Sequence, residues 1–235
     1  MMEFLFDTAN IEEIKTYGEC FPYTGVTSNP SIIKAEGKID FFAHFREIRR
    51  IIGKERTLHI QTLAMNFDNI VREADAILSH VDENVYIKIP TTEDGLKAMQ
   101  VLKKRGVHIT ATAIYSKIQG FMAINAGADF IAPYCNRMEN QDIDPLDTIS
   151  AFAKMIRSQG CSTKIVAASF KNIAQVNDAL VAGAQTVTLQ PALLHDVFSI
   201  ATIAKAVDAF ATDWTAVFGK EDILSLAEKE KAALT

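Results

Sequence analysis

A single lysine interrupts a strongly apolar stretch near the middle of the 235-residue chain. Lys88 stands between Val85-Tyr86-Ile87 and Ile89-Pro90, a run typical of a strand that is buried on both faces. Burial without a partner disfavours the protonated form of an amine, and the neutral form is the one that attacks a carbonyl carbon. The residue therefore indicates Schiff-base chemistry. Pairing with a carboxylate inside the fold, or a position at a strand end that is open to water, would explain Lys88 equally well.

Polar residues recur at the ends of the other β-prone runs. In a parallel barrel the carboxyl ends of the strands meet at one rim, and residues two apart along a strand share a face. By this alternation seven predicted strands end on a polar side chain: Asp7, Asn29, Gln61, Lys88, Thr112, Tyr134 and Ser169. Each has a structural explanation by itself, since Asn29 precedes a proline and Ser169 could be a helix N-cap. Their convergence around a buried lysine favours an active site.

The residue types suggest separate roles in such a site. The carboxylate of Asp7 could hold a substrate hydroxyl or move a proton, or it could form an ordinary ion pair. Three side chains could jointly hold one water that shuttles protons during imine formation: Gln61, Thr112 and Tyr134. Arg137, paired with Ser169 at the opening of the next helix, would complete a phosphate site.

Alternating strands and helices predict the fold. Eight β-rich runs lie at residues 4–8, 25–29, 58–63, 85–90, 108–114, 130–134, 164–169 and 186–190. Between them, helical spacing predicts helices that include residues 67–80, 93–105, 116–126, 147–158 and 172–182. Strict alternation implies parallel strands with right-handed crossovers, and a count of eight favours a (β/α)₈ TIM barrel. A doubly wound open sheet is the competitor, but no glycine-rich dinucleotide fingerprint follows the first run.

The chain reads as one domain over residues 1–235, in which residues 206–235 form a C-terminal helical extension. No linker rich in proline, glycine or serine divides it. Within the extension Phe210, Trp214 and Phe218 fall at i, i+4 and i+8 and form an aromatic stripe. This stripe packs either on the chain's own barrel or on a neighbouring subunit.

Composition excludes several other classes of protein. An apolar content of 49% with a net charge of −5 fits a soluble globular protein. The basic residues are dispersed and give no nucleic-acid footprint, so a small molecule is the expected partner. No run is long enough to span a membrane, and three widely spaced cysteines fit a reducing cytoplasm. The five histidines lack metal-binding spacing, so no metal site is expected. Cys135 is interpreted as a packed rather than a reactive thiol.

Six short motifs span the chain: Asp7-Thr8-Ala9-Asn10, Gly25-Val26-Thr27-Ser28-Asn29-Pro30-Ser31, Tyr86-Ile87-Lys88-Ile89-Pro90, Ala113-Ile114-Tyr115, Ala132-Pro133-Tyr134-Cys135-Asn136-Arg137 and Ala167-Ala168-Ser169-Phe170-Lys171. Together they resemble the transaldolase family, and the chain length resembles the short subfamily that includes fructose-6-phosphate aldolase. The resemblance implies Lys88 as the Schiff-base nucleophile, Asp7 as the proton-transfer and hydroxyl-binding acid, and Asn29 as a ligand of the ketose hydroxyls. It also implies Gln61, Thr112 and Tyr134 around a catalytic water, and Arg137 with Ser169 around the sugar phosphate. No metal or organic cofactor is implied.

Two positions divide the family. Gln61 and Tyr134 stand where typical transaldolases carry glutamate and phenylalanine, and the chain in this respect resembles the aldolases. A phenol beside the catalytic water can protonate the enamine and release dihydroxyacetone. The resemblance thus favours a class I aldolase that cleaves fructose 6-phosphate into dihydroxyacetone and glyceraldehyde 3-phosphate or forms it from them. The alternatives are a transaldolase of the pentose phosphate pathway and, more remotely, a sugar-phosphate-binding barrel without turnover. The resemblance further implies a homo-oligomer, a pentamer or decamer, in which the C-terminal helix reaches another subunit.

Overall fold

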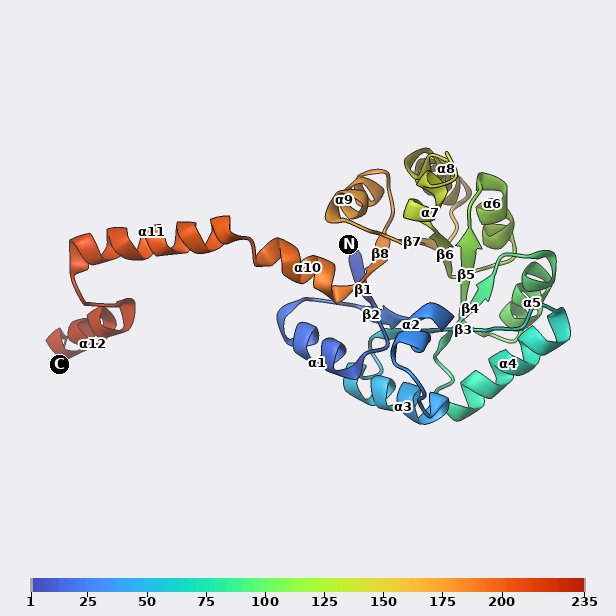
Figure 1. Ribbon diagram of the computed structural model, residues 1–235, viewed down its shortest axis with the longest axis horizontal. Coiled ribbons are helices and arrows are strands. Elements are labelled where there is room, and N and C mark those ends of the chain that lie inside the picture. The colour runs from blue at the N-terminus through green and yellow to red at the C-terminus, as the bar shows by residue number, and fades with distance from the viewer. Residues whose placement is uncertain (1, 235) are drawn as a thin grey trace. The chain divides into compact units, whose positions relative to one another are not determined.

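The computed structural model describes residues 2–234. In this part of the chain eight parallel strands close into a barrel, each paired with its neighbour in sequence and the last with the first (Figure 1). The strands are β1 (Glu3–Asp7), β2 (Gly25–Thr27), β3 (Thr57–Gln61), β4 (Tyr86–Pro90), β5 (Ile109–Ile114), β6 (Phe130–Pro133), β7 (Lys164–Ala167) and β8 (Thr186–Leu189). The predicted barrel is confirmed. Most strands end one or two residues earlier than predicted, because the polar residues that follow belong to the rim loops.

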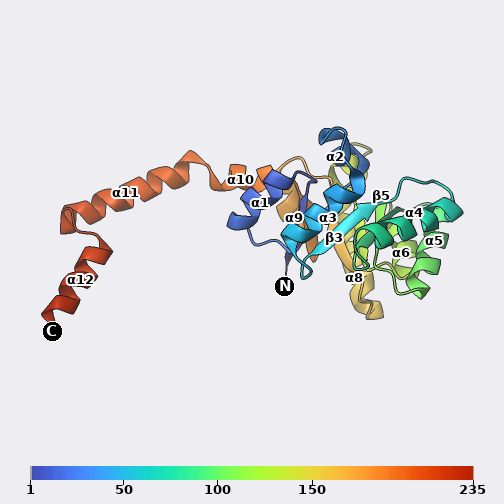
Figure 2. The ribbon, with the colours of Figure 1, turned by 90° about the horizontal axis from the view of Figure 1, so that it is seen from below.

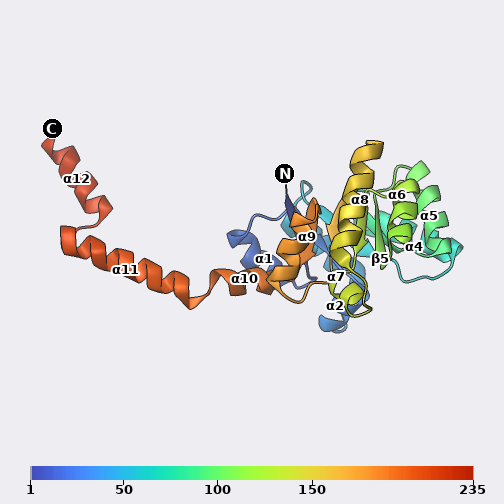
Figure 3. The ribbon, with the colours of Figure 1, turned by 90° about the horizontal axis from the view of Figure 1, so that it is seen from above.

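Figure 1 shows helices α3, α4, α5, α6, α8 and α9 around the strands, and Figures 2 and 3 show the same elements from two sides. The helices up to residue 198 are α1 (Ile11–Cys20), α2 (Pro30–Ala35), α3 (Phe41–Ile52), α4 (Phe67–His80), α5 (Glu93–Lys104), α6 (Lys117–Asn125), α7 (Cys135–Glu139), α8 (Pro145–Gln159), α9 (Ile173–Val181) and α10 (Pro191–Phe198). Many begin at a side chain that accepts a hydrogen bond from the first turn, including Asn10, Asn29, Asp40, Asn66, Thr92, Asp144 and Asn172. Such caps satisfy amide groups that have no partner within the helix, so they fix where each strand-to-helix loop ends.

The main core lies between the strands and the helices. Outward residues of the strands, such as Phe6, Ile60 and Ile87, are fully buried against apolar helix faces. Burying each such side chain contributes roughly 1.5–3 kcal/mol. Packing is tight where α6 meets α8: a β-carbon at Gly120 would lie 2.2 Å from the Phe152 ring. Glycine at this position therefore allows the two helices to approach closely.

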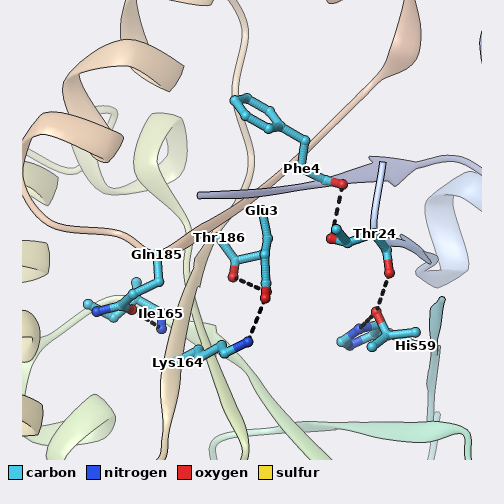
Figure 4. A network of polar contacts seen from close by, with 9 residues as sticks. Glu3, Phe4, Thr24, His59, Lys164, Ile165, Gln185 and Thr186 are labelled. Atoms are coloured by element: carbon cyan, nitrogen blue, oxygen red, sulfur yellow. Dashed lines mark hydrogen bonds and ion pairs between the residues drawn. The ribbon is translucent and has the colours of Figure 1, made fainter. Parts of the chain in front are cut away.

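The barrel interior is mixed in character. Leu5, Phe130, Ala132 and Val166 form an apolar layer with Tyr86 packed against it. At the amino-terminal end of the strands the layer gives way to polar contacts (Figure 4). There the Glu3 carboxylate accepts hydrogen bonds from Lys164 at 2.6 Å and from Thr186 at 3.0 Å. These contacts join the amino-terminal ends of β1, β7 and β8.

His59 fills the interior between that layer and Lys88. It is fully buried, its ring nitrogens are 2.7 Å from Thr110 Oγ1 and 2.9 Å from Thr57 Oγ1, and the ring stacks on Tyr86 at 4.7 Å between centroids. Burial, reinforced by the nearby charge of Lys88, holds the pKa of His59 well below its usual value. The imidazole is therefore neutral at physiological pH.

The chain divides into two compact units, one ending at Leu193 and the other beginning at Leu194. The second unit contains α11 (Ala201–Phe218) and α12 (Ile223–Ala233). Within it the Trp214 ring stacks on Phe218 at 4.4 Å, and its indole N–H donates to the Glu221 carbonyl at 2.6 Å. Over residues 2–234 the structure contains no helix with the length and apolar character needed to cross a membrane.

Candidate active site

A cavity of about 580 Å³ opens at the carboxyl ends of the strands. The cavity is lined by six of the eight residues that were predicted to form the site: Asp7, Asn29, Lys88, Tyr134, Arg137 and Ser169. The two others, Gln61 and Thr112, are not among its lining residues. Thr112 nevertheless shares a 2.8 Å hydrogen bond with the Tyr134 hydroxyl, which connects it to the cavity.

Lys88 occupies the middle of β4 and is only 2% exposed. Its neighbours across the sheet are Gln61 on β3 and Thr110 on β5, and paired residues of parallel strands point to the same side. The Nζ atom donates to the Ser28 carbonyl at 3.2 Å. No carboxylate in residues 2–234 forms an ion pair with it. Pairing with a carboxylate, one of the two structural explanations for this lysine, is therefore wrong.

Asp7 is held in place by two threonines. Thr27 Oγ1 donates to the Asp7 carboxylate at 2.7 Å and lies 2.6 Å from Thr188 Oγ1. Because a hydroxyl has one proton, Thr188 must be the donor in the second hydrogen bond. The hydrogen bond from Thr27 thus fixes the orientation of the Asp7 carboxylate, whose oxygens can still accept a hydrogen bond from a hydroxyl in the cavity. Neither threonine belonged to the predicted site, although strand alternation places both on the inward face.

Asn29 caps helix α2 and also lines the cavity. Its side-chain oxygen accepts hydrogen bonds from Ser31 N at 2.9 Å and Ile32 N at 3.1 Å, which makes it the N-cap of α2. Since the oxygen is committed to the helix, the amide nitrogen is the group that can donate to a ligand in the cavity. The cap therefore fixes the orientation of the donor.

Gln61 lies on the other side of Lys88 from Thr112 and Tyr134. Its Oε1 is buried and has no hydrogen-bond partner in residues 2–234. It lines a second cavity of about 300 Å³, which is mostly apolar and which shares Asn29 with the first. A buried acceptor of this kind is costly unless something donates to it during function. The three side chains expected around one water thus divide into a bonded pair and a separate glutamine.

The two exposed basic side chains of the cavity, Arg137 and Lys171, lie on its β6–β7 side. Arg137 and Lys171 line it together with Ser169, whose φ of 64° is unusual for a residue other than glycine. The prediction that Ser169 is a helix N-cap is wrong: Asn172 caps α9, which begins at Ile173. Ser169 instead lies in the loop that precedes α9, where its carbonyl accepts a hydrogen bond from Asn136 N of α7 at 3.0 Å.

The β1–β2 side of the cavity is acidic. Glu13 accepts a 2.7 Å hydrogen bond from Thr8, and Glu36 accepts weaker ones from Asn10 at 3.3 and 3.4 Å. Both carboxylates line the cavity with Asp7. An anionic group is therefore favoured near the cations of the β6–β7 side and disfavoured near this one.

Cys135 begins the short helix α7 and is buried. Burial raises its pKa to about 12, so the side chain is a protonated thiol at neutral pH. A protonated, buried thiol is a poor nucleophile, which agrees with its interpretation as a packing residue.

Comparison with known proteins gives a consistent result. A family described as Transaldolase/Fructose-6-phosphate aldolase matches residues 4–232. A probable fructose-6-phosphate aldolase from Streptococcus pneumoniae is 47% identical over 222 residues, which cover 94% of this chain and 100% of the relative. Both matches cover nearly all of the chain.

Proposed function

Because the chain belongs to the transaldolase/fructose-6-phosphate aldolase family, we propose that it is a class I aldolase that forms and cleaves fructose 6-phosphate through an imine at Lys88. The single observation that supports this most strongly is the position of Lys88, buried inside the barrel, without a carboxylate partner, and at the base of a cavity. Such an amine can add to a ketone in the absence of a metal or organic cofactor.

In the cleavage direction the Lys88 amine adds to the C2 ketone and forms a carbinolamine. The carbinolamine hydroxyl takes a proton through the water of the site and leaves as water, which gives a protonated imine. This imine draws electrons from the C3–C4 bond as Asp7 removes the proton of the C4 hydroxyl. Glyceraldehyde 3-phosphate departs as an aldehyde, and an enamine stays on the lysine. Tyr134 donates a proton to the enamine carbon, and hydrolysis then releases dihydroxyacetone and the free amine.

The water that is lost and regained in these steps needs a fixed site. The Tyr134 hydroxyl and Thr112 Oγ1 form one bonded pair, and the buried Oε1 of Gln61 is an acceptor without a partner on the other side of Lys88. We assign these three side chains to proton transfer through water, with Tyr134 as the donor.

Substrate orientation follows from the charge of the cavity. Arg137 and the loop at Ser169 would bind the C6 phosphate, whereas Asn29 and Asp7 would bind the hydroxyls of the three-carbon donor half. Glu13 and Glu36 lie on the donor side, where they disfavour a second phosphate. This supports dihydroxyacetone, rather than its phosphate, as the donor.

The remaining expectations also belong to this proposal. We place the enzyme in the cytoplasm as a homo-oligomer, a pentamer or decamer. The exposed apolar side chains of α11, among them Val207, Phe210 and Val217, support contacts between subunits.

The test is borohydride reduction in the presence of dihydroxyacetone, followed by peptide mass mapping. The expected result is a three-carbon adduct on Lys88 in the wild-type protein and in a Lys104→Arg control, which changes an exposed lysine at the end of α5. Lys88→Arg should form no adduct. An adduct on another lysine would refute the assignment.

A second assay separates the aldolase from the transaldolase. The protein is incubated with fructose 6-phosphate and no acceptor aldehyde. Steady release of free dihydroxyacetone is expected, because Tyr134 can protonate the enamine without waiting for an acceptor. Release of none, with transfer restored by erythrose 4-phosphate, would indicate a transferase.

A further inference from the structure

The end of β5 departs from regular strand geometry. On β5 and β6, Ala111 pairs with Ile131, but the next pairing joins Ile114 to Pro133, so β5 contains one extra residue. Ala113 lies within this bulge and has a φ of 56°, a conformation that residues other than glycine rarely adopt. Bulges of this kind occur next to active sites, where they redirect a side chain.

The bulge reverses the facing of the residues that follow it. Thr112 faces inward with Tyr134, so uninterrupted alternation would turn Ile114 inward and Tyr115 outward. The extra residue instead pairs Ile114 with Pro133, and Ile114 is fully buried. Tyr115 is thereby turned toward the site. Its backbone is fixed there, because Tyr115 N donates to Gln119 Oε1 at 3.0 Å.

In this position Tyr115 contacts two residues of the candidate site at once. Its ring meets the Tyr134 ring edge-on, with centroids 5.6 Å apart and planes at 77°. Its hydroxyl oxygen accepts a hydrogen bond from Arg137 Nη1 at 3.4 Å. The guanidinium of Arg137 in turn lies over the face of Tyr134, 4.9 Å from the centroid. The three side chains therefore form a closed set of contacts.

We propose that Tyr115 is a positioning residue that couples phosphate binding by Arg137 to proton donation by Tyr134. Tyr115 does not line the cavity, so it acts through the other two side chains. The Tyr115 hydroxyl restrains the exposed guanidinium of Arg137. The Tyr115 ring restrains the Tyr134 ring, whose hydroxyl is hydrogen-bonded to Thr112. The proposal rests on the aldolase function assigned above.

The two contacts can be separated by substitution. Tyr115→Phe removes the hydroxyl and keeps the ring, whereas Tyr115→Leu removes both. In the synthesis direction, Tyr115→Phe should raise the KM for glyceraldehyde 3-phosphate about fivefold, as expected for the loss of one long, exposed hydrogen bond. The KM for unphosphorylated glyceraldehyde should be unchanged. An equal change for both aldehydes would overturn the first half of the proposal.

A double-mutant cycle tests whether this effect passes through Arg137. In an Arg137→Ala background, Tyr115→Phe should cause no further change in the KM for the phosphorylated aldehyde. If the effects of the two substitutions multiply, the hydroxyl does not act through the guanidinium and the coupling is refuted.

Exchange of dihydroxyacetone protons in D₂O, followed by NMR, measures enamine formation and protonation without any phosphate. Tyr115→Leu should slow this exchange about tenfold, which is part of the roughly 10²–10⁴-fold that a positioned general acid contributes, because Tyr134 is displaced but still present. Tyr115→Phe should leave the exchange close to the wild-type rate. Equal rates in all three proteins, or equal slowing in both variants, would refute the role of the ring.

Borohydride trapping with dihydroxyacetone separates failure of this proposal from failure of the proposed function. Both Tyr115 variants should form the Lys88 adduct to the wild-type extent, which also shows that they are folded. If the wild-type protein forms no adduct, the aldolase function itself is wrong. If adducts form but the phosphate-specific and exchange effects are absent, only the coupling is wrong.

Discussion

Lowering the pH should destabilise the barrel through His59. Burial, followed by the charges of Lys88, Arg49 and His108, holds the pKa of this imidazole well below its usual 6.5. In the unfolded chain the ring binds a proton below pH 6.5, and in the folded barrel it does not. The unfolded state therefore binds more protons as the pH falls, so the stability that is present above pH 6.5 is lost progressively below it.

The size of the effect follows from this difference in proton binding. With an unfolded pKa near 6.5 and a folded protein that stays neutral at His59, lowering the pH from 7 to 5 removes about 2 kcal/mol from the free energy of unfolding. For a domain of this length that corresponds to a fall of about 4–8 °C in Tm.

The assay is urea unfolding at pH 7 and at pH 5 for three proteins. His59→Gln retains hydrogen-bonding groups for Thr57 and Thr110 but cannot titrate, so it should lose about 2 kcal/mol less stability than the wild type between the two pH values. Tyr86→Phe is the matched control, since it changes the ring that stacks on His59 without altering titration in this range. Equal losses in the wild type and His59→Gln would refute the reasoning.

The site supports further predictions. Asn29→Asp should keep the N-cap of α2 and its stability but raise the KM for dihydroxyacetone by removing the amide donor, whereas Asn29→Ala should also cost about 1 kcal/mol in urea unfolding. Thr27→Val should lower kcat about tenfold by releasing the Asp7 carboxylate, with Lys88 adduct formation as the check that the barrel is intact. A labelling time course with iodoacetamide at pH 8, read by mass spectrometry, should modify exposed Cys20 and spare Cys135; fast labelling of Cys135 would contradict its burial.

The amino-acid sequence was enough to predict the fold and to single out Lys88 as the centre of the candidate site. Strand and helix periods are local properties of the chain, so eight alternating units could be counted, and helix α4 has the predicted bounds of residues 67–80. Lys88 stood out because a charged group within a buried strand conflicts with its surroundings. Strand alternation then indicated Asp7 and the other residues at the rim, since facing repeats every two residues.

The arrangement of these residues became visible only in the folded barrel. The hydrogen bond between Thr27 and Thr188 joins residues 161 positions apart, and it exists because the barrel closes. The bulge at Ala113 breaks the two-residue alternation, so no pattern in the sequence placed Tyr115 beside Arg137. The separation of Gln61 from the Thr112–Tyr134 pair depends likewise on which strands are neighbours. Local periodicity specifies the elements and their faces, whereas contacts across the barrel depend on closure, register and a single inserted residue.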